Sequence, residues 1–211
     1  MTNDVLDCES VDLFPNEIDS LVLSIYDATI SGISELNRSA HKGFQASKWS
    51  HPDEKAQELA WWEDQIAVLQ YHAGGVGLVS LIMLFEQRVK YFHAMGEARN
   101  ILQKTSKKSK EPSTKERFLN IEKVLGASPL SVDRLQKLLT ARNSLVHHAG
   151  ALKYEFKNQP CRVDEEFIGE ITEGDFRVGI SREILIRVAD EIKGHAALWF
   201  RKLRSRANAQ P

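Results

Sequence analysis

The stretch GGVGLVSLIMLF, residues 74–85, determines how the rest of this sequence is interpreted. From Val76 to Phe85 it is apolar almost all round, which is typical of a helix buried at the centre of a bundle. It lies inside a longer helical pattern that runs from Asp53 to about Lys104, and its three glycines indicate either a bend or close helix packing. These glycines do not form a phosphate-binding loop, because the GxxxxGK[ST] pattern is absent and no expected strand precedes them.

Amphipathic patterns on both sides of this centre predict further helices. Apolar residues at steps of three and four predict a helix over residues 16–36, and the polar residues 37–52 are expected to form a loop. Serine and threonine caps and apolar periodicity predict three more helices, at 114–125, 131–148 and 181–204. Residues 166–171 and 176–180 flank a Thr-Glu-Gly-Asp turn and predict a short β-hairpin. The expected fold is all-α, a bundle of about five or six helices with a small β-hairpin before the C-terminal helix.

Composition limits the class of protein. The chain has 211 residues, of which 42% are apolar and 27% charged, so a folded domain with a sizeable core is expected and disordered or collagen-like chains are excluded. Two distant cysteines, Cys8 and Cys161, exclude a disulfide framework and a cysteine-rich zinc site. The acidic N-terminus lacks the apolar core of a signal peptide, and the longest apolar run is about half the length that crosses a bilayer. A soluble cytoplasmic protein is therefore expected.

Charge is distributed unevenly although the net charge is only −1. Residues 1–20 hold six acidic and no basic side chains, whereas residues 101–117 have a net charge of +4 and residues 192–211 of +5. These basic stretches are either solvated surface or patches that attract phosphate groups. We expect an acidic N-terminal segment at 1–15, a helical domain at 16–206 and a C-terminal tail at 207–211.

The helix expected at 131–148 contains the clearest chemical signal. Its apolar residues cluster on one face, and Arg142 falls in the middle of that face, where a cation breaks the pattern. Asn143 and His147 are four residues apart and therefore neighbours on successive turns. Arg142 and His147 point about 140° away from each other on an ideal helix. One straight helix cannot present both to a small group unless the arginine reaches round or the helix frays, but two such helices packed together could.

A purely structural interpretation of these residues is also open. Arg142 could be a core arginine paired with a buried carboxylate, for which Glu86 is a plausible partner. His147 and His148 could simply end the helix, where a cation suits the helix dipole.

Residues 142–147, RNSLVH, resemble the R-N-x-x-x-H signature of HEPN domains (higher eukaryote and prokaryote nucleotide-binding). In that family the signature lies toward the end of a late helix in an all-α bundle. The resemblance covers most of the chain as helix order but only these six residues as a motif. It implies a metal-independent endoribonuclease of a toxin–antitoxin or phage-defence system that uses no cofactor. It also implies a homodimer with arginine and histidine of both chains at a shared cleft, with RNA as substrate and an antitoxin or defence protein as a further partner.

The implied chemistry suits these side chains. RNA cleavage requires the 2′-hydroxyl to attack the adjacent phosphate, and a histidine can exchange that proton at neutral pH. An arginine can hold the phosphate and stabilise the developing charge. The candidate catalytic residues are Arg142, His147 and Asn143, with His148 as an alternative to His147; Glu86 is a candidate supporting residue, and Lys107, Lys108 and Lys110 are candidate RNA contacts.

Two other functions remain open. One is a HEPN-like interaction module, or a nucleotide- or RNA-binding module, that has no enzymatic activity. The other is an unrelated helical scaffold.

The remaining aromatic and histidine residues of the long helix are expected in structural roles. Trp61, Trp62 and Tyr71 are expected in the core or at an interface, because no basic residues alternate with them as in a base-stacking surface. His72 and His93 are expected to be hydrogen-bonded core histidines.

Overall fold

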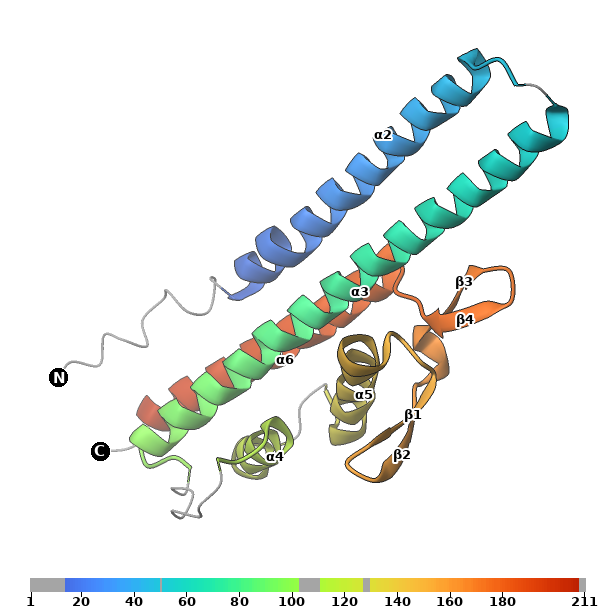
Figure 1. Cartoon of the computed structure of the whole chain (residues 1–211). Coiled ribbons are helices and arrows are strands. Elements are labelled where there is room, and N and C mark those ends of the chain that lie inside the picture. Colours follow the sequence, from blue (N-terminus) through green and yellow to red (C-terminus); the bar gives the residue numbers. More distant parts are fainter. Residues whose placement is uncertain (1–13, 50, 103–110, 127–129, 209–211) are drawn as a thin grey trace.

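The computed structural model describes residues 14–49, 51–102, 111–126 and 130–208. Its helices are η2 (Ile18–Leu23), α2 (Ser24–Ala46), α3 (Pro52–Ala98), α4 (Thr114–Leu125), α5 (Val132–His148), η3 (Glu165–Phe167) and α6 (Arg182–Asn208), and its strands are β1 (Lys153–Phe156), β2 (Gln159–Arg162), β3 (Ile168–Thr172) and β4 (Asp175–Val178). The long α3 packs against α2, α4, α5, α6 and β3 (Figure 1). The predicted helical fold with a small β element before the last helix is confirmed.

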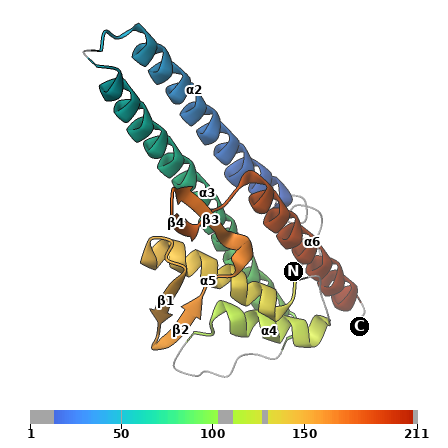
Figure 2. The same ribbon diagram turned by 90° about the vertical axis from the view of Figure 1, so that its right-hand side faces the viewer.

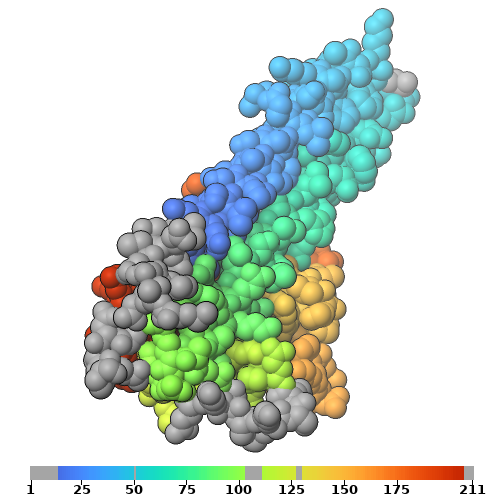
Figure 3. Space-filling model, turned by 90° about the vertical axis from the view of Figure 1, so that its left-hand side faces the viewer, coloured from blue at the N-terminus to red at the C-terminus, as the bar shows by residue number. Residues whose placement is uncertain are grey.

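One end of the molecule is an antiparallel helical hairpin, here called the arm, which is formed by residues 36–49 and 51–66 and projects away from the rest of the chain (Figures 1, 2 and 3). The prediction of a loop over 37–52 is wrong for residues 37–46, which continue α2. These residues are mostly polar because only one side of this helix contacts α3. On that side the Trp62 indole Nε1 donates a hydrogen bond to Oδ1 of Asn37 at 2.9 Å, and the Phe44 and Trp62 ring centroids lie 6.5 Å apart.

The glycines of α3 allow close packing. The helix is unbroken from Pro52 to Ala98. A Cβ built on Gly74 would lie 2.2 Å from the carbonyl oxygen of Ile180, and one on Gly77 would lie 2.9 Å from the Leu185 side chain. The glycines therefore let the segment that enters α6 contact the α3 backbone directly.

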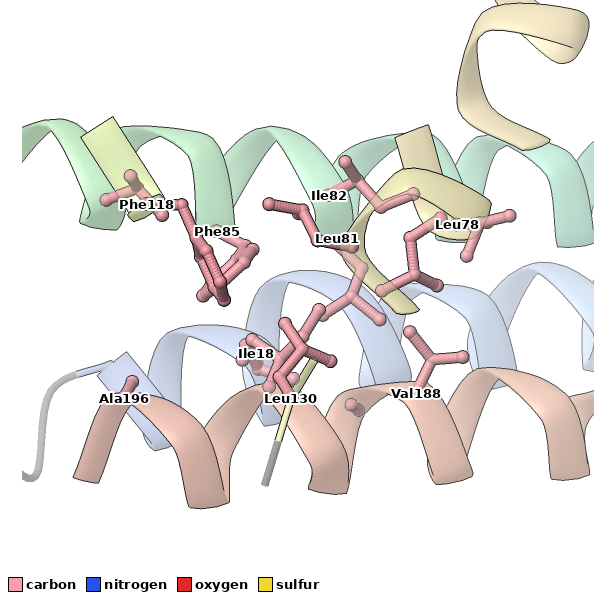
Figure 4. Packing of buried hydrophobic residues seen from close by; sticks show 14 of the residues in the cluster. Ile18, Leu78, Leu81, Ile82, Phe85, Phe118, Leu130, Val188 and Ala196 are labelled. Atoms are coloured by element: carbon pink, nitrogen blue, oxygen red, sulfur yellow. The ribbon is translucent and has the colours of Figure 1, made fainter. Parts of the chain in front are cut away.

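One face of α3 forms the centre of the hydrophobic core. Leu78, Leu81, Ile82 and Phe85 are buried against side chains of η2, α4, α5 and α6 (Figure 4). The prediction that residues 76–85 are buried all round is wrong, because Val76 and Met83 are 65% and 46% exposed. By length and composition alone α3 could cross a membrane, and only 39% of its most apolar window is buried. The described part of this chain thus covers α3 on one side only.

Two separate antiparallel hairpins lie between α5 and α6. The pair β3–β4 confirms the predicted hairpin and its register places Ile168 opposite Val178. The pair β1–β2 was not predicted. Its turn residues Lys157 and Asn158 both have positive φ, of 54° and 62°, but neither is a glycine, so the sequence lacks the usual signal for such a turn. In addition, Pro160 weakens the strand pattern of β2.

The core between α4 and the middle of α6 encloses a histidine. His195 is fully buried, and its Nδ1 accepts a hydrogen bond from the backbone N–H of Leu130 at 3.3 Å. The Phe118 ring stacks on it at a centroid distance of 5.1 Å. Burial lowers the pKa of His195 to about 3, so the ring is neutral in the folded protein at neutral pH.

We expect the free energy of unfolding to fall as the pH falls from about 6.5 to about 3. The unfolded chain takes up a proton on His195 in this range and the folded chain does not, so each pH unit costs up to about 1.4 kcal/mol. The loss of stability begins when the pH falls below the pKa that His195 has in the unfolded chain. It levels off when the pH falls below the pKa that His195 has in the folded chain. Urea unfolding of the wild type and of His195→Asn between pH 7 and pH 4 measures this, because asparagine keeps an acceptor without titrating. An identical pH slope in both proteins would disprove the assignment.

Candidate functional site

The helix α5 is regular to its end. The Ser131 hydroxyl accepts a hydrogen bond from the backbone N–H of Arg134 at 3.0 Å and begins the helix. Ala149 follows in the left-handed conformation with φ 49°, and the N–H of Gly150 donates to the carbonyl of Ser144 at 3.0 Å. Arg142, Asn143 and His147 therefore keep ideal helical spacing.

Side chains from other elements fix the end of α5. The hydroxyl of Tyr71 and Nη1 of Arg177 both donate to the carbonyl of Ala149, at 3.3 and 3.4 Å. Burial raises the pKa of Tyr71, so the phenol keeps the proton that it donates. A Cβ on Gly150 would lie 2.0 Å from the Tyr71 oxygen and φ there is +80°, which explains why glycine occupies this position.

Arg142 is held on the α3 side of α5. Its Nη2 lies 3.6 Å from Oε2 of Glu86, and both side chains are 24% exposed. Its Nη1 donates to Oδ1 of Asn143 at 2.8 Å, and the Thr114 hydroxyl donates to Oε1 of Glu86 at 3.1 Å. Nε of Arg142 is buried and finds no hydrogen-bond partner within the described residues. The structural partner expected for Arg142 is thus present, and one donor of the guanidinium remains unused.

The side chains of His147 and His148, at the end of α5, pack against the β1–β2 hairpin instead. His147 is exposed, and its ring stacks on Phe156 at a centroid distance of 6.2 Å. His148 stacks on Tyr154 at 4.3 Å, and its Nε2 is buried and lacks a hydrogen-bond partner within the described residues. Burial raises the pKa of Tyr154 to about 12, and its hydroxyl donates to the carbonyl of Thr140 at 2.8 Å. Tyr154 and Phe156 therefore set the positions of both rings.

The candidate residues thus fall into two groups within one copy of the chain. Arg142, Asn143 and Glu86 contact one another, whereas His147 and His148 contact the hairpin. Sequence reasoning missed Tyr154 and Phe156; the signal that could have found them is their alternation within a short strand. The candidate RNA contacts Lys107, Lys108 and Lys110 lie outside the described residues. No group of three or more His, Cys, Asp or Glu side chains that could hold a metal ion occurs among the described residues.

An exposed apolar surface adjoins the motif. Leu69, Val76 and Met83 are spaced seven residues apart along α3 and are each more than 40% exposed, and together with Leu21, Ile25 and Val146 they form what we call the outer face. Val76 and Val146 line a groove of about 500 Å³ between α3 and the end of α5. A second groove, of about 340 Å³, separates α3 from η2 and α2. Arg142 precedes Val146 by one helical turn, so it lies at the edge of the outer face.

The other aromatic and histidine side chains of α3 differ in how far they are exposed to solvent. Trp61 is 57% exposed, so of the two positions expected for it, core or interface, the core is excluded. His72 is also exposed, which contradicts its expected core role. His93 is buried, and its Nε2 lies 3.0 Å from the side-chain nitrogen of Asn120, as expected for a satisfied core histidine.

Comparisons of this chain with family models, with curated protein sequences and with solved structures find no match. The resemblance to HEPN domains therefore rests on residues 142–147 and on the order of the helices.

Proposed function

We propose that this protein is a cytoplasmic, metal-independent endoribonuclease of the HEPN type that acts as a homodimer in toxin–antitoxin or phage-defence biology. The observation that carries the proposal is Arg142. It is a cation in the middle of an apolar helix face, begins the R-N-x-x-x-H pattern and lies at the edge of the outer face. Because Glu86 and Asn143 hold its guanidinium in place, it is preorganised to bind a phosphate.

In the proposed reaction His147 takes the proton of the 2′-hydroxyl while the 2′ oxygen bonds to phosphorus. The bond from phosphorus to the 5′ oxygen breaks, and that oxygen leaves with a proton from water. Arg142 stabilises the negative charge that develops on the phosphate oxygens. The exposure of the His147 ring and the burial of Nε2 of His148 favour His147 as the base.

The outer face supports a second copy of the chain as the partner. An exposed apolar surface that extends along α3 from Leu69 to Met83 and is bordered by polar groups is typical of a protein interface. The exposed His72 and the Glu86–Arg142 ion pair lie beside the outer face. Burial of these polar groups in lipid would be costly, so the outer face suits a protein partner better than a membrane. A two-fold dimer through this face would bring the two α5 helices together. Arg142 of one copy and His147 of the other could then share a cleft, which a single copy does not provide.

The ion pair between Arg142 and Glu86 also favours a second function, a HEPN-like interaction or RNA-binding module without activity. In that case Arg142 serves to join α5 to α3, and Glu86, which also accepts a hydrogen bond from Thr114, joins both helices to α4. Such a protein would bind partners or RNA and cleave nothing.

Incubation of the purified full chain with single-stranded RNA in EDTA tests the proposal. We expect cleavage without added metal, products with 2′,3′-cyclic phosphate and 5′-hydroxyl ends, and no cleavage of the all-2′-deoxy analogue. Cleavage that requires magnesium, or products with 5′-phosphate ends, would contradict it. RNA binding without cleavage would favour the non-enzymatic module.

A further inference from the structure

The free end of the arm contains a pocket that the proposed ribonuclease site does not use. Its volume is about 590 Å³, and it is lined by Trp49, Glu54, Gln57, Glu58 and Trp61. Trp49 comes from the turn between α2 and α3, and the other four residues come from the first three turns of α3. The pocket therefore lies where the arm projects farthest from the body (Figure 1).

The two tryptophans of this pocket are presented to solvent in different ways. Trp49 stacks on Phe44 at a centroid distance of 5.8 Å, and its Nε1 donates to the carbonyl of Phe44 at 3.0 Å. The orientation of this indole is therefore fixed before any ligand binds. Trp61 is 57% exposed, whereas the neighbouring Trp62 is half-buried and hydrogen-bonded to Asn37. An indole of this size left open to water is a typical anchor for a partner.

Two carboxylates complete the pocket. Glu54, Glu58 and Trp61 recur at steps of four and three residues and therefore lie on one face of α3. Within the described residues neither glutamate forms an ion pair with a lysine or arginine, in contrast to Glu86 and Glu166. Residues 52–66 hold five acidic side chains and one lysine. The pocket thus combines indole rings with two carboxylates that, among the described residues, form no ion pair with a lysine or arginine.

From this juxtaposition we infer that the end of the arm binds a lysine or arginine side chain of a partner protein. A cation is attracted to the faces of indole rings and to carboxylates, and this pocket offers both. A phosphate backbone would be repelled by Glu54 and Glu58, so RNA is not the occupant. An open site at the end of a projecting arm suits a side chain that extends from a large partner. The inference does not depend on RNA cleavage.

The experiment follows the indole N–H signals of the ¹⁵N-labelled full chain, which has four tryptophans. The probes are Nα-acetyl-arginine amide, Nα-acetyl-lysine amide and an octa-arginine peptide, with uncharged Nα-acetyl-norleucine amide as control. We expect the signals of Trp49 and Trp61 to shift with the cationic probes and that of the buried Trp199 to stay constant. Single amides should bind with a dissociation constant on the order of 1 mM, and the peptide should bind more tightly.

Matched variants separate the pocket from general charge. The double variant Glu54→Gln/Glu58→Gln should weaken binding about tenfold. Glu63→Gln/Asp64→Asn removes the same charge from exposed positions on the same helix, outside the pocket, and should leave affinity within about twofold. Trp61→Ala should remove the shift of Trp49. Equal weakening in the two double variants, equal shifts with the norleucine amide, or no shift with any cationic probe would overturn the inference.

Discussion

Replacement of Arg142 or of His147 by alanine is expected to lower the rate of RNA cleavage at least about 10²-fold while the protein stays folded. Loss of a general base typically costs about 10²- to 10⁴-fold, and loss of one group that stabilises a developing anion costs about 10²- to 10³-fold. His147 is exposed and stacks on Phe156 at the edge of the fold, so its removal is expected to leave the core intact. Initial rates in EDTA together with thermal unfolding curves measure both effects.

Control variants make this prediction specific. Arg162→Ala and His41→Ala remove the same side-chain types at positions outside the site and should cleave RNA at the wild-type rate. Glu86→Gln loses the ion pair but keeps the shape, so a smaller decrease of about tenfold is expected if Glu86 only positions Arg142. Wild-type activity in His147→Ala combined with inactivity in His148→Ala would reassign the base. Unfolding of Arg142→Ala, with His147→Ala fully active, would support the structural role of the arginine.

Replacement of Val76 by aspartate is expected to convert a dimer into a monomer and to lower cleavage at micromolar concentrations at least about tenfold. Val76 lies between the two grooves of the outer face and is 65% exposed in the single chain. The aspartate carboxylate would stay in contact with water in the monomer, so it should cost little folding free energy. In the dimer it would be buried without a partner, which opposes association. Analytical ultracentrifugation and the cleavage assay on the same samples measure the result.

The matched control for this variant is Leu36→Asp. Leu36 is an exposed apolar residue, at 48%, that lies on the arm and lines neither groove of the outer face, so this variant should remain dimeric and active. A wild-type protein that is monomeric at concentrations where it cleaves RNA would show that the outer face has another role. A Val76→Asp variant that remains dimeric would show that the copies meet elsewhere.

Local chemistry explains why most of the helical fold was predictable. Ser113 and Glu116 form a reciprocal capping box at the start of α4, and Ser131 caps α5; both signals involve residues close in sequence. Residues 37–46 and the β1–β2 hairpin were missed because their conformations depend on distant contacts, such as that between Asn37 and Trp62. Periodicity likewise cannot reveal that one side of α3 lacks a covering element.

The candidate site was predictable to a similar extent. The sequence placed Arg142 in an apolar helix face and offered Glu86 as a plausible partner for it, and the ion pair is present. The placement of His147 against Phe156 did not follow, because it depends on a hairpin that has no clear turn signal. Sequence spacing therefore identified the residue types, whereas the structure identified which neighbours each one has.

Mixing the inactive Arg142→Ala and His147→Ala proteins, with exchange of subunits, tests the shared site most directly. In a mixed dimer one cleft has Arg142 from one copy and His147 from the other, and the second cleft has neither. Random exchange should therefore restore about a quarter of the wild-type rate, since half of the dimers are mixed and each of these has one complete cleft. A mixture that stays as inactive as its two components, although ultracentrifugation shows that mixed dimers have formed, would contradict a cleft built from both copies.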